Sequence, residues 1–360
     1  MHDTVIVGGG LCGLSLADSL CGMGRSFALY EARNRLGGRI LSVQCGSIRL
    51  DLGPTWYWPD MQPRMARLVS DLGLESFPQH DIGTVRHLSD AEKEPVTVRL
   101  ADVHGGARRI SGGMAAMVDA LARRLPQESI RMERELVSVC SRETHVELLF
   151  RSFGVNEIVR AKRAVLAIPP RLLEEKVDFA PGLDTKVRDA MRATHTWMAG
   201  QAKAVVGYEA PFWRQAGESG NAFVSHSQAV LGEIFDACDA GGQHAALGGF
   251  FALQPGYRAS VHPESMTMLI SSQLVQVFGL EAECGEQRMQ DWASEPFTCS
   301  ALDLEPPEGH PEYGDANLCL PLWGNRLFLA GSETAGYGGG YMEGALEAAA
   351  RVSQMLLLCA

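Results

Sequence analysis

Residues 4–13 read Thr4-Val5-Ile6-Val7-Gly8-Gly9-Gly10-Leu11-Cys12-Gly13. The first four predict a short buried strand that the glycines end. The glycines fit the pattern G-x-G-x-x-G, in which Gly8 permits a tight turn and Gly10 lets the backbone approach a pyrophosphate. Gly13 lets a helix, predicted over residues 14–20, pack close to the strand. The N–H groups at the start of that helix attract phosphate.

A second strand is predicted over residues 27–30, and Glu31 follows at its end. A carboxylate in this place accepts hydrogen bonds from ribose hydroxyls. Strand, glycine turn, helix, strand and acid therefore occur in the order of a dinucleotide-binding βαβ unit. The order favours a dinucleotide site over a plain βαβ turn, but it does not separate NAD from FAD.

The residues after Glu31 separate the two dinucleotides. Residues 31–39 read E-A-R-N-R-L-G-G-R, a pattern that resembles the GR2-type flavoproteins, which include amine oxidases, L-amino-acid oxidases and carotenoid desaturases. Gly38 lets the chain turn across the cofactor, and Arg39 can pair with the pyrophosphate. The resemblance implies FAD as the cofactor. It also places Arg33 near the cofactor, with a solvated basic turn as the alternative.

The C-terminal part carries a second resemblance. Residues 325–335 predict a strand that ends in Gly331-Ser332-Glu333-Thr334, and residues 340–345 read G-Y-M-E-G-A before a helix rich in alanine and leucine. This segment is similar to the closing segment of the flavin-containing monoamine oxidase family. The family implies that Gly331 lies at the cofactor and that Glu333 binds a ribityl or ribose hydroxyl. The N–H groups around Met342 would face the flavin pyrimidine carbonyl and favour the anionic reduced flavin.

The resemblance also implies a fold and a domain organisation. We expect an α/β protein with a Rossmann-like FAD-binding domain of the GR2 type and a second α+β substrate domain built on an antiparallel sheet. The FAD-binding domain is expected to be discontinuous, with residues 1–73, 109–170 and 296–360. The substrate domain would contain residues 74–108 and 171–295.

Further cofactor contacts follow from the resemblance. Residues Gly53, Pro54, Thr55 and Trp56 are expected beneath the flavin, and the backbone of Val137 is expected to meet the adenine. Residues 111–125 predict a helix, and residues 135–139 predict a strand. The segment between residues 74 and 109 is short for the family. This predicts either a more open cavity or one that a second copy completes in a homodimer.

Two residues are expected to be catalytic. Lys203 lies in an apolar strand, where an ammonium group is costly without a partner. Its spacing to Pro211-Phe212-Trp213 resembles that of the family lysine that holds a water molecule against flavin N5; an edge-strand lysine that reaches solvent is the alternative. Tyr341 corresponds to one wall of the family's aromatic cage, where it would steer the amine toward N5.

The residues expected at the other walls of the pocket depart from the family pattern. Trp56 is expected as a second wall, with a buried packing tryptophan as the alternative. When this segment is aligned with the family on Glu295-Pro296, the family's flavin-linked cysteine corresponds to Ala301 and its second cage tyrosine corresponds to Leu302. Cys299 lies two residues before the position of the flavin-linked cysteine. We therefore expect non-covalent FAD. Leu302 would widen the pocket, or Trp197 or Tyr337 would replace the missing aromatic wall.

The reaction implied by the resemblance is oxidative deamination of a primary or secondary amine. A hydride equivalent passes to flavin N5, the imine is hydrolysed to an aldehyde or ketone plus ammonia, and O2 reoxidises the flavin to give hydrogen peroxide. An L-amino-acid oxidase is an alternative that needs an arginine for the substrate carboxylate, for which Arg171 and Arg258 are the candidates. A desaturase and a non-catalytic flavin-binding accessory protein also remain open.

Composition limits the partners. The chain has 360 residues with 46% hydrophobic and 21% charged residues, and its formal net charge of −11 argues against a nucleic-acid binder. Nine cysteines without a C-x-x-C pair predict free thiols in a reducing cytosol and no metal site. The N-terminus lacks a signal-peptide pattern, and the apolar residues 355–360 are too few to span a bilayer. We expect a cytoplasmic enzyme without a membrane partner, with a small amine and O2 as reactants.

Overall fold

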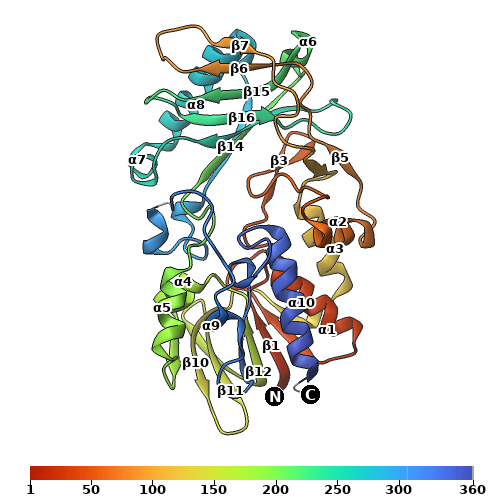
Figure 1. Ribbon diagram of the computed structural model, residues 1–360, viewed down its shortest axis with the longest axis vertical. Coiled ribbons are helices and arrows are strands. Elements are labelled where there is room, and N and C mark those ends of the chain that lie inside the picture. The colour runs from red at the N-terminus through yellow and green to blue at the C-terminus, as the bar shows by residue number, and fades with distance from the viewer. Residues whose placement is uncertain (306, 359–360) are drawn as a thin grey trace.

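The computed structural model describes residues 1–305 and 307–358. The molecule is elongated, with one large β-sheet toward each end, and both termini lie at the same end (Figure 1). Cys359 and Ala360, at the end of the apolar C-terminal segment, lie outside the described residues. Within the described ranges, no helix is both long enough and apolar enough to cross a bilayer.

The sheet near the termini is built around β1 (His2–Val7), which runs parallel to β2 (Phe27–Tyr30) and to β12 (Val155–Leu166). Val5, Ile6 and Val7 are 0%, 0% and 3% exposed. Because successive residues of a strand point to opposite faces, β1 is buried on both faces. The eight strands are β13 (Asp178–Ala180), β10 (Glu135–Ser141), β11 (Val146–Ser152), β12, β1, β2 and β9 (Ile130–Arg131) in this order, with β19 (Leu327–Leu329) paired to β12.

Helices cover both faces of this sheet. The face to which Ile6 points packs against α1 (Leu11–Gly22), α3 (Ala115–Arg124) and α10 (Met342–Leu358). The face of Val5 and Val7 packs against α4 (Pro170–Lys176), α5 (Thr185–Ala193) and α9 (Ala316–Cys319). The predicted α/β class is confirmed.

The predicted elements of this part are found with small shifts. The strand expected over residues 4–7 lies within β1, the strand over 27–30 coincides with β2, and the strand over 135–139 lies within β10. The helix expected over residues 111–125 is shorter and is α3. Gly112 and Gly113 have φ angles of 81° and 78°, in the left-handed region, so the helix begins only after them.

The sheet at the other end is mainly antiparallel, as expected for the second unit; only β15 and β6 run parallel. Helix α8 (Pro263–Phe278) packs on it through Met266, Ile270 and Leu274. The seven strands in order are β18 (Glu286–Asp291), β14 (Ala202–Tyr208), β17 (Ala245–Phe251), β16 (Leu231–Asp236), β15 (Glu218–Val224), β6 (Thr84–Leu88) and β7 (Val96–Val98).

The segment that follows residue 170 packs with the first sheet. Strand β13 pairs with β10, and Leu173, Val187 and Met191 are buried in the core beneath that sheet. A domain boundary between residues 170 and 171 would cut through this core. We therefore propose that the first domain continues to residue 193.

The remaining elements are short. They are β3 (Ser42–Cys45), β4 (Ile48–Asp51), β5 (Ser76–Pro78), β8 (Arg108–Ile110), α2 (Pro63–Asp71), α6 (Phe212–Gln215), α7 (Pro255–Ser260), and the 3-10 turns η1 (Gln127–Ser129), η2 (Leu280–Ala282), η3 (Trp292–Ser294), η4 (Ala301–Leu304) and η5 (Ser332–Thr334).

Candidate active site

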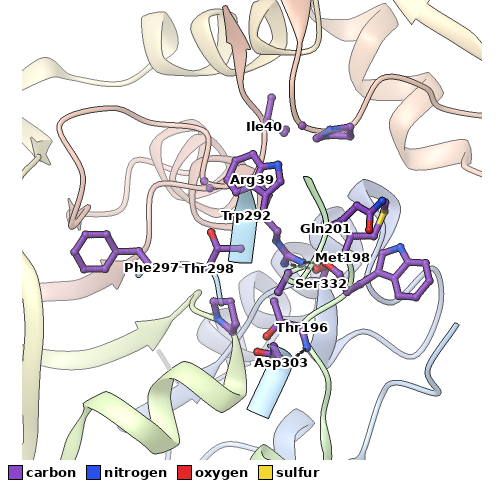
Figure 2. Close-up of a pocket in the computed structure, with 18 of the residues that line it drawn as sticks. Arg39, Ile40, Thr196, Met198, Gln201, Trp292, Phe297, Thr298, Asp303 and Ser332 are labelled. Atoms are coloured by element: carbon purple, nitrogen blue, oxygen red, sulfur yellow. Dashed lines mark hydrogen bonds between the residues drawn. The ribbon is translucent and has the colours of Figure 1, made fainter. Parts of the chain in front are cut away.

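A cavity of about 770 Å³ lies between the two sheets. One end is lined by the turns that follow β1 and β2, and the other by side chains of β14, β16 and β17. Figure 2 shows part of the lining, with Arg39 close to Ser332 and with Thr196 beside Asp303. The volume is in the range of cofactor and ligand sites.

Most of the predicted cofactor contacts meet at this cavity. Gly13 and Val137 are not among the lining residues. Those that line it are Gly8, Gly10, Cys12, Glu31, Arg33, Gly38, Arg39, Gly53, Pro54, Thr55, Trp56, Gly331, Glu333 and Met342.

The glycines of the first turn serve different purposes. Gly8 has a φ of 109°, and a Cβ on Gly13 would lie 1.9 Å from the carbonyl oxygen of Gly8. Gly13 therefore lets α1 pack against the end of β1 from behind the cavity. At Gly10 the nearest atom to an added Cβ is the Cα of Gly38, at 3.9 Å. Two glycines thus face each other on the cavity wall and leave room that side chains would fill.

Glu31 ends β2 as a buried carboxylate, 4% exposed. Its Oε2 accepts a hydrogen bond from the N–H of Gly9 at 2.7 Å, and its Oε1 accepts one from the N–H of Arg33 at 2.9 Å. The remaining lone pairs are available to hydroxyl donors. The guanidinium of Arg33 donates to Glu295 at 3.3 Å and to Thr298 at 2.9 Å, so Arg33 joins this turn to a distant segment of the wall.

Arg39 and Glu333, which both line the cavity, form an ion pair. Arg39 Nη1 lies 2.6 Å from Glu333 Oε1, and Arg39 Nη2 donates to the hydroxyl of Ser332 at 3.0 Å. The Arg39 side chain remains 28% exposed. The guanidinium also donates to the carbonyl oxygen of Trp197 at 3.2 Å and to Glu333 Oε2 at 3.0 Å, so it offers a pyrophosphate its positive charge and the N–H groups that remain.

The start of α10 also faces the cavity, through Tyr341 and Met342. The next residue, Glu343, is fully buried, and its Oε2 accepts a hydrogen bond from the N–H of Met65 at 2.9 Å. This bond ties the first turn of α10 to α2. The positive end of the α10 dipole is therefore fixed at the cavity.

Lys203 joins the second sheet to the loop at residues 53–56. Its side chain is buried, and Nζ donates to the carbonyl oxygen of Gly53 at 2.9 Å and to the hydroxyl of Thr55. Nζ also lies 5.2 Å from the ring centres of Phe235 and Phe250. The alternative of an edge-strand lysine that reaches solvent does not hold, because β14 lies between β17 and β18.

Burial lowers the pKa of Lys203 to about 7, because the ammonium group loses its hydration. The like charge of Arg109 acts in the same direction, while the carboxylates of Asp51 and Glu233 oppose it. An amine with a pKa near neutrality can both hold and release a proton at physiological pH.

An aromatic wall is formed by Tyr341 and Trp197, which both line the cavity. Their ring centres are 6.5 Å apart, with the planes inclined by 55°. His310 stacks on Tyr341, with ring centres 4.8 Å apart and planes inclined by 5°. Trp56 lines another side, where its Nε1 donates to Gln79 at 2.8 Å. Of the two candidates for the missing wall, Trp197 is the one placed at the cavity.

Leu302 and Tyr337 do not line the cavity, which corrects the expectation for both. They are 54% and 53% exposed. In η4 the carboxylate of Asp303 turns inward to Arg171, at 2.8 Å, and the neighbouring Leu302 consequently points outward. The hydroxyl of Tyr337 donates to the carbonyl oxygen of Met61 at 2.6 Å, which holds the ring at the surface.

The expected adenine contact moves by one or two residues. Strand β10 bulges between Leu136 and Ser138, so Val137 is the extra residue of the bulge. Glu135 and Leu136 line the cavity, and Val137 does not. A β-bulge of this kind has no signature in the sequence of the strand.

Two residues that the sequence pattern does not single out belong to the site. Glu233 on β16 lines the cavity, and His104 lies 3.8 Å from it, measured from Nε2 to Oε1. A carboxylate among the otherwise uncharged residues 231–235 is the same kind of signal as Lys203 in its strand. It could have been found in that way.

The donor and acceptor groups around the cavity fit FAD. The facing glycines leave room for a pyrophosphate, Arg39 offers it a cation, and Glu31 offers acceptors to ribose hydroxyls. The start of α10 offers N–H groups to the flavin ring.

Comparison with known proteins supports this fit. The sequence matches the family described as flavin containing amine oxidoreductase over residues 11–97 and 88–357. It is 24% identical to flavin-containing amine oxidase B of Homo sapiens and 22% identical to that of Sus scrofa, with 99% of this chain and 86% of each relative covered. The alignments span 456 positions, so these relatives contain segments that this chain lacks.

Solved structures show the same fold. A double mutant of putrescine oxidase superposes with a TM-score of 0.83 and 20% identity over 99% of both chains. Cyclohexylamine oxidase from Brevibacterium oxydans superposes with a TM-score of 0.81 and 17% identity, over 99% of this chain and 98% of the other. With its family match extending over most of its length, the chain belongs to the flavin-containing amine oxidoreductase family.

Proposed function

We propose that this flavin amine oxidase binds FAD non-covalently, deaminates primary or secondary amines and uses O2 as the electron acceptor. The observation that carries the proposal is the buried amine of Lys203, which reaches from the antiparallel sheet to the loop at residues 53–56. No other lysine among the described residues is buried in this way.

The chain would hold FAD along the cavity by groups already described. Glu31 would bind ribose hydroxyls, Arg39 would bind the pyrophosphate between Gly10 and Gly38, and the N–H groups of α10 near Met342 would face the flavin ring. When bound, FAD accepts a hydride equivalent from the carbon next to the amine nitrogen and returns the electrons to O2.

Lys203 supplies a nitrogen that can orient water and move a proton. Two of its hydrogen bonds go to Gly53 and Thr55, which fixes the side chain on the cavity wall. With a pKa of about 7, the nitrogen is present both as ammonium and as amine near neutral pH. We infer that Nζ orients the water molecule that hydrolyses the imine product and takes up a proton from it.

The apolar part of the cavity prepares the substrate. Trp56, Trp197, Phe250 and Tyr341 present aromatic faces and edges to it. An ammonium ion loses hydration in such surroundings, which lowers its pKa and releases the neutral amine that reacts. The aromatic faces at the same time attract the substrate nitrogen.

The cysteines near the cavity favour non-covalent FAD. Cys299 is 8% exposed and is not among the lining residues, and burial raises its pKa to about 11. Cys12 lines the cavity at the first glycine turn, and burial raises its pKa to about 12. A thiol that stays protonated is a poor nucleophile toward a flavin.

The arginines near the cavity disfavour an L-amino-acid oxidase. Arg171 binds Asp303 at 2.8 Å, and Arg258 forms two hydrogen bonds with Asp291, at 2.7 Å and 2.8 Å. Both also donate to backbone carbonyl oxygens. Each guanidinium is therefore committed to the protein and has little left for a substrate carboxylate.

The test is reduction of the flavin without oxygen. The purified protein is loaded with FAD and mixed anaerobically with primary amines, secondary amines or L-amino acids, while the absorbance of oxidised flavin is followed. We expect amines to bleach the flavin, and air to restore it with release of hydrogen peroxide. Bleaching by L-amino acids alone would replace the proposal by an amino-acid oxidase. A flavin that nothing bleaches would favour the desaturase or the accessory protein.

Location and assembly complete the proposal. We propose a cytoplasmic protein, supported by the eight described cysteines, which are all free thiols. A second copy of the chain is the proposed partner at the surface around Tyr337 and Tyr341. There Tyr341 is 39% exposed, and the nearby Tyr337 and Met61 are 53% and 59% exposed. Sedimentation of the FAD-loaded protein tests the dimer.

A further inference from the structure

Lys203, Phe250 and Glu233 form a row across three neighbouring strands. Lys203 on β14 pairs with Phe250 on β17, and Phe250 pairs with Glu233 on β16. Residues directly opposite each other in a sheet point to the same face, and all three line the cavity. With strands about 4.8 Å apart, the Cα atoms at the two ends of the row are about 10 Å apart.

Among the described residues, the carboxylate of Glu233 accepts no hydrogen bond, and its ion-pair contact is with His104 Nε2 at 3.8 Å. Its side chain is 38% exposed. The other carboxylates on nearby walls are occupied: Glu333 binds Arg39, and Asp303 binds Arg171. Glu233 is thus an acceptor directed to the part of the cavity that Lys203 and Phe250 line.

His104 supports Glu233 from behind. His104 is 7% exposed, and its Nδ1 lies 2.6 Å from Asp81 Oδ1, while its backbone N–H donates to Asp81 Oδ2 at 3.0 Å. Asp81 therefore holds the Nδ1 edge of the ring, and the Nε2 edge is turned toward Glu233. Nε2 is buried without a hydrogen-bond partner and faces Glu233 Oε1 at 3.8 Å.

Asp81 is itself fixed. Its Oδ1 also accepts a hydrogen bond from Asn221 on β15 at 2.8 Å. The chain of contacts from Asn221 through Asp81 and His104 therefore holds the imidazole in one orientation, beside the side chain of Glu233. A ring that is held in this way restricts the conformers open to the carboxylate.

We infer, on the basis of the amine oxidation proposed above, that Glu233 binds a second cationic group of the substrate. His104 and Asp81 act as positioning residues for its carboxylate. The site then takes diamines, and other amines with a positive charge at the end remote from the reacting nitrogen. The ring of Phe250, which lies between Lys203 and Glu233, offers an apolar surface to the carbon chain that joins the two ends.

The electrostatics of the cavity agree with this assignment. Burial raises the pKa of Glu233, while the nearby charges of His104 and Lys203 lower it. A partly desolvated carboxylate without a hydrogen-bonded cation gains from any cation that enters its surroundings. The opposite end of the row carries Lys203, whose ammonium form repels a charged group. A substrate with two nitrogens is therefore oriented with its charged end at Glu233.

The experiment compares α,ω-diamines of four to eight carbons with n-alkylamines of the same length. The FAD-loaded enzyme is reduced anaerobically in a rapid-mixing instrument, which yields a dissociation constant and a reduction rate for each amine. We expect the diamine of the best length to bind about 10- to 100-fold tighter than its monoamine, the range for a hydrogen bond to a charged group. The measured quantity is the ratio of the two dissociation constants.

The variants are chosen to change this ratio. Glu233→Gln is expected to bring the ratio close to one, and His104→Gln to lower it in part, because the carboxylate is then less well positioned. The matched control is Glu209→Gln, an exposed carboxylate just after β14, which is expected to keep the wild-type ratio. Because the ratio is taken within one protein, general damage to the enzyme cancels.

Two results would overturn the inference. The first is a wild-type enzyme that binds diamines and monoamines equally well, and the second is a diamine preference that survives in Glu233→Gln. If no amine reduces the flavin, the proposed function fails on its own. The subsite is then still tested by calorimetric titration of the FAD-loaded protein and of Glu233→Gln with the same pairs.

Discussion

Replacing Lys203 by methionine is expected to change how the stability of the protein depends on pH. Methionine has a similar length and keeps contacts with Phe235 and Phe250, but it carries no ionisable group. The hydrogen bonds to Gly53 and Thr55 are lost at every pH. The part of the stability difference between wild type and variant that varies with pH therefore reports the protonation of the buried amine.

The size of the effect follows from the pKa of Lys203. The pKa is about 7 in the folded protein, against an ordinary value of 10.5. Between these values the unfolded chain binds a proton that the folded chain does not, so the free energy of unfolding rises with pH. The free-energy cost of burying the ammonium group is fully present below the pKa of the folded protein, and it decreases as the pH rises toward the pKa of the unfolded chain. At about 1.4 kcal/mol per pH unit, with the folded site half protonated at pH 7, the wild type gains about 2 kcal/mol by pH 9.

The assay is urea unfolding of the flavin-free protein at pH 7, 8 and 9, followed by circular dichroism. The difference in unfolding free energy between wild type and Lys203→Met is expected to shift by about 2 kcal/mol in favour of the wild type over this range. Thiols and tyrosines that titrate in the same range cancel in the difference. Lys186→Met, at an exposed position of α5, is the matched control and should show no such shift. A difference for Lys203→Met that stays constant within about 0.5 kcal/mol would refute the buried-amine argument.

Three further changes test other parts of the site. Gly13→Ala places a Cβ 1.9 Å from the carbonyl oxygen of Gly8 and should weaken FAD binding by more than about tenfold in a fluorescence titration. The control is Gly22→Ala, whose Cβ has no atom within 4 Å, and it should change the free energy of unfolding by less than about 1 kcal/mol. Glu343→Gln should cost about 1–3 kcal/mol in urea unfolding, because the fully buried carboxylate that accepts from the first turn of α2 loses its charge; a cost near zero would contradict its role. Acid precipitation should release the flavin from wild type and from Cys299→Ser alike, and yellow wild-type precipitate would contradict non-covalent binding.

The cofactor half of the site could be predicted because its contacts are local. Glu31 reaches Gly9, 22 residues earlier, within one βαβ unit, and the turn residues between them carry their conformational requirements in their identity. The C-terminal segment adds Glu333 and Met342 through an equally compact motif. The misses in this half are small shifts, such as Val137 in the bulge of β10, where the backbone departs from a regular ladder.

The substrate half could be predicted only where one residue is chemically conspicuous. Lys203 stands out as a charge in an apolar strand, but its partners Gly53 and Thr55 are 150 and 148 residues away. Counting from Glu295-Pro296 predicts Leu302 at the pocket only if the segment continues in the conformation of the family. The capping box of Ser300 and Asp303 turns it into η4 instead, and the side chain points outward.

The position of Glu233 shows why the pocket itself is beyond such counting. Glu233 lies opposite Phe250 because the ladder between β16 and β17 is regular from Asp236, which pairs with Leu247, back to Glu233. This register is set by the connection between the two strands, and its conformation cannot be read from the residues of β16. Since the side chains of a strand alternate between its two faces, a register that differed by one residue would turn Glu233 away from the cavity. The ratio of diamine to monoamine binding measures the consequence of that register, because a Glu233 turned to the other face could not distinguish the two ligands.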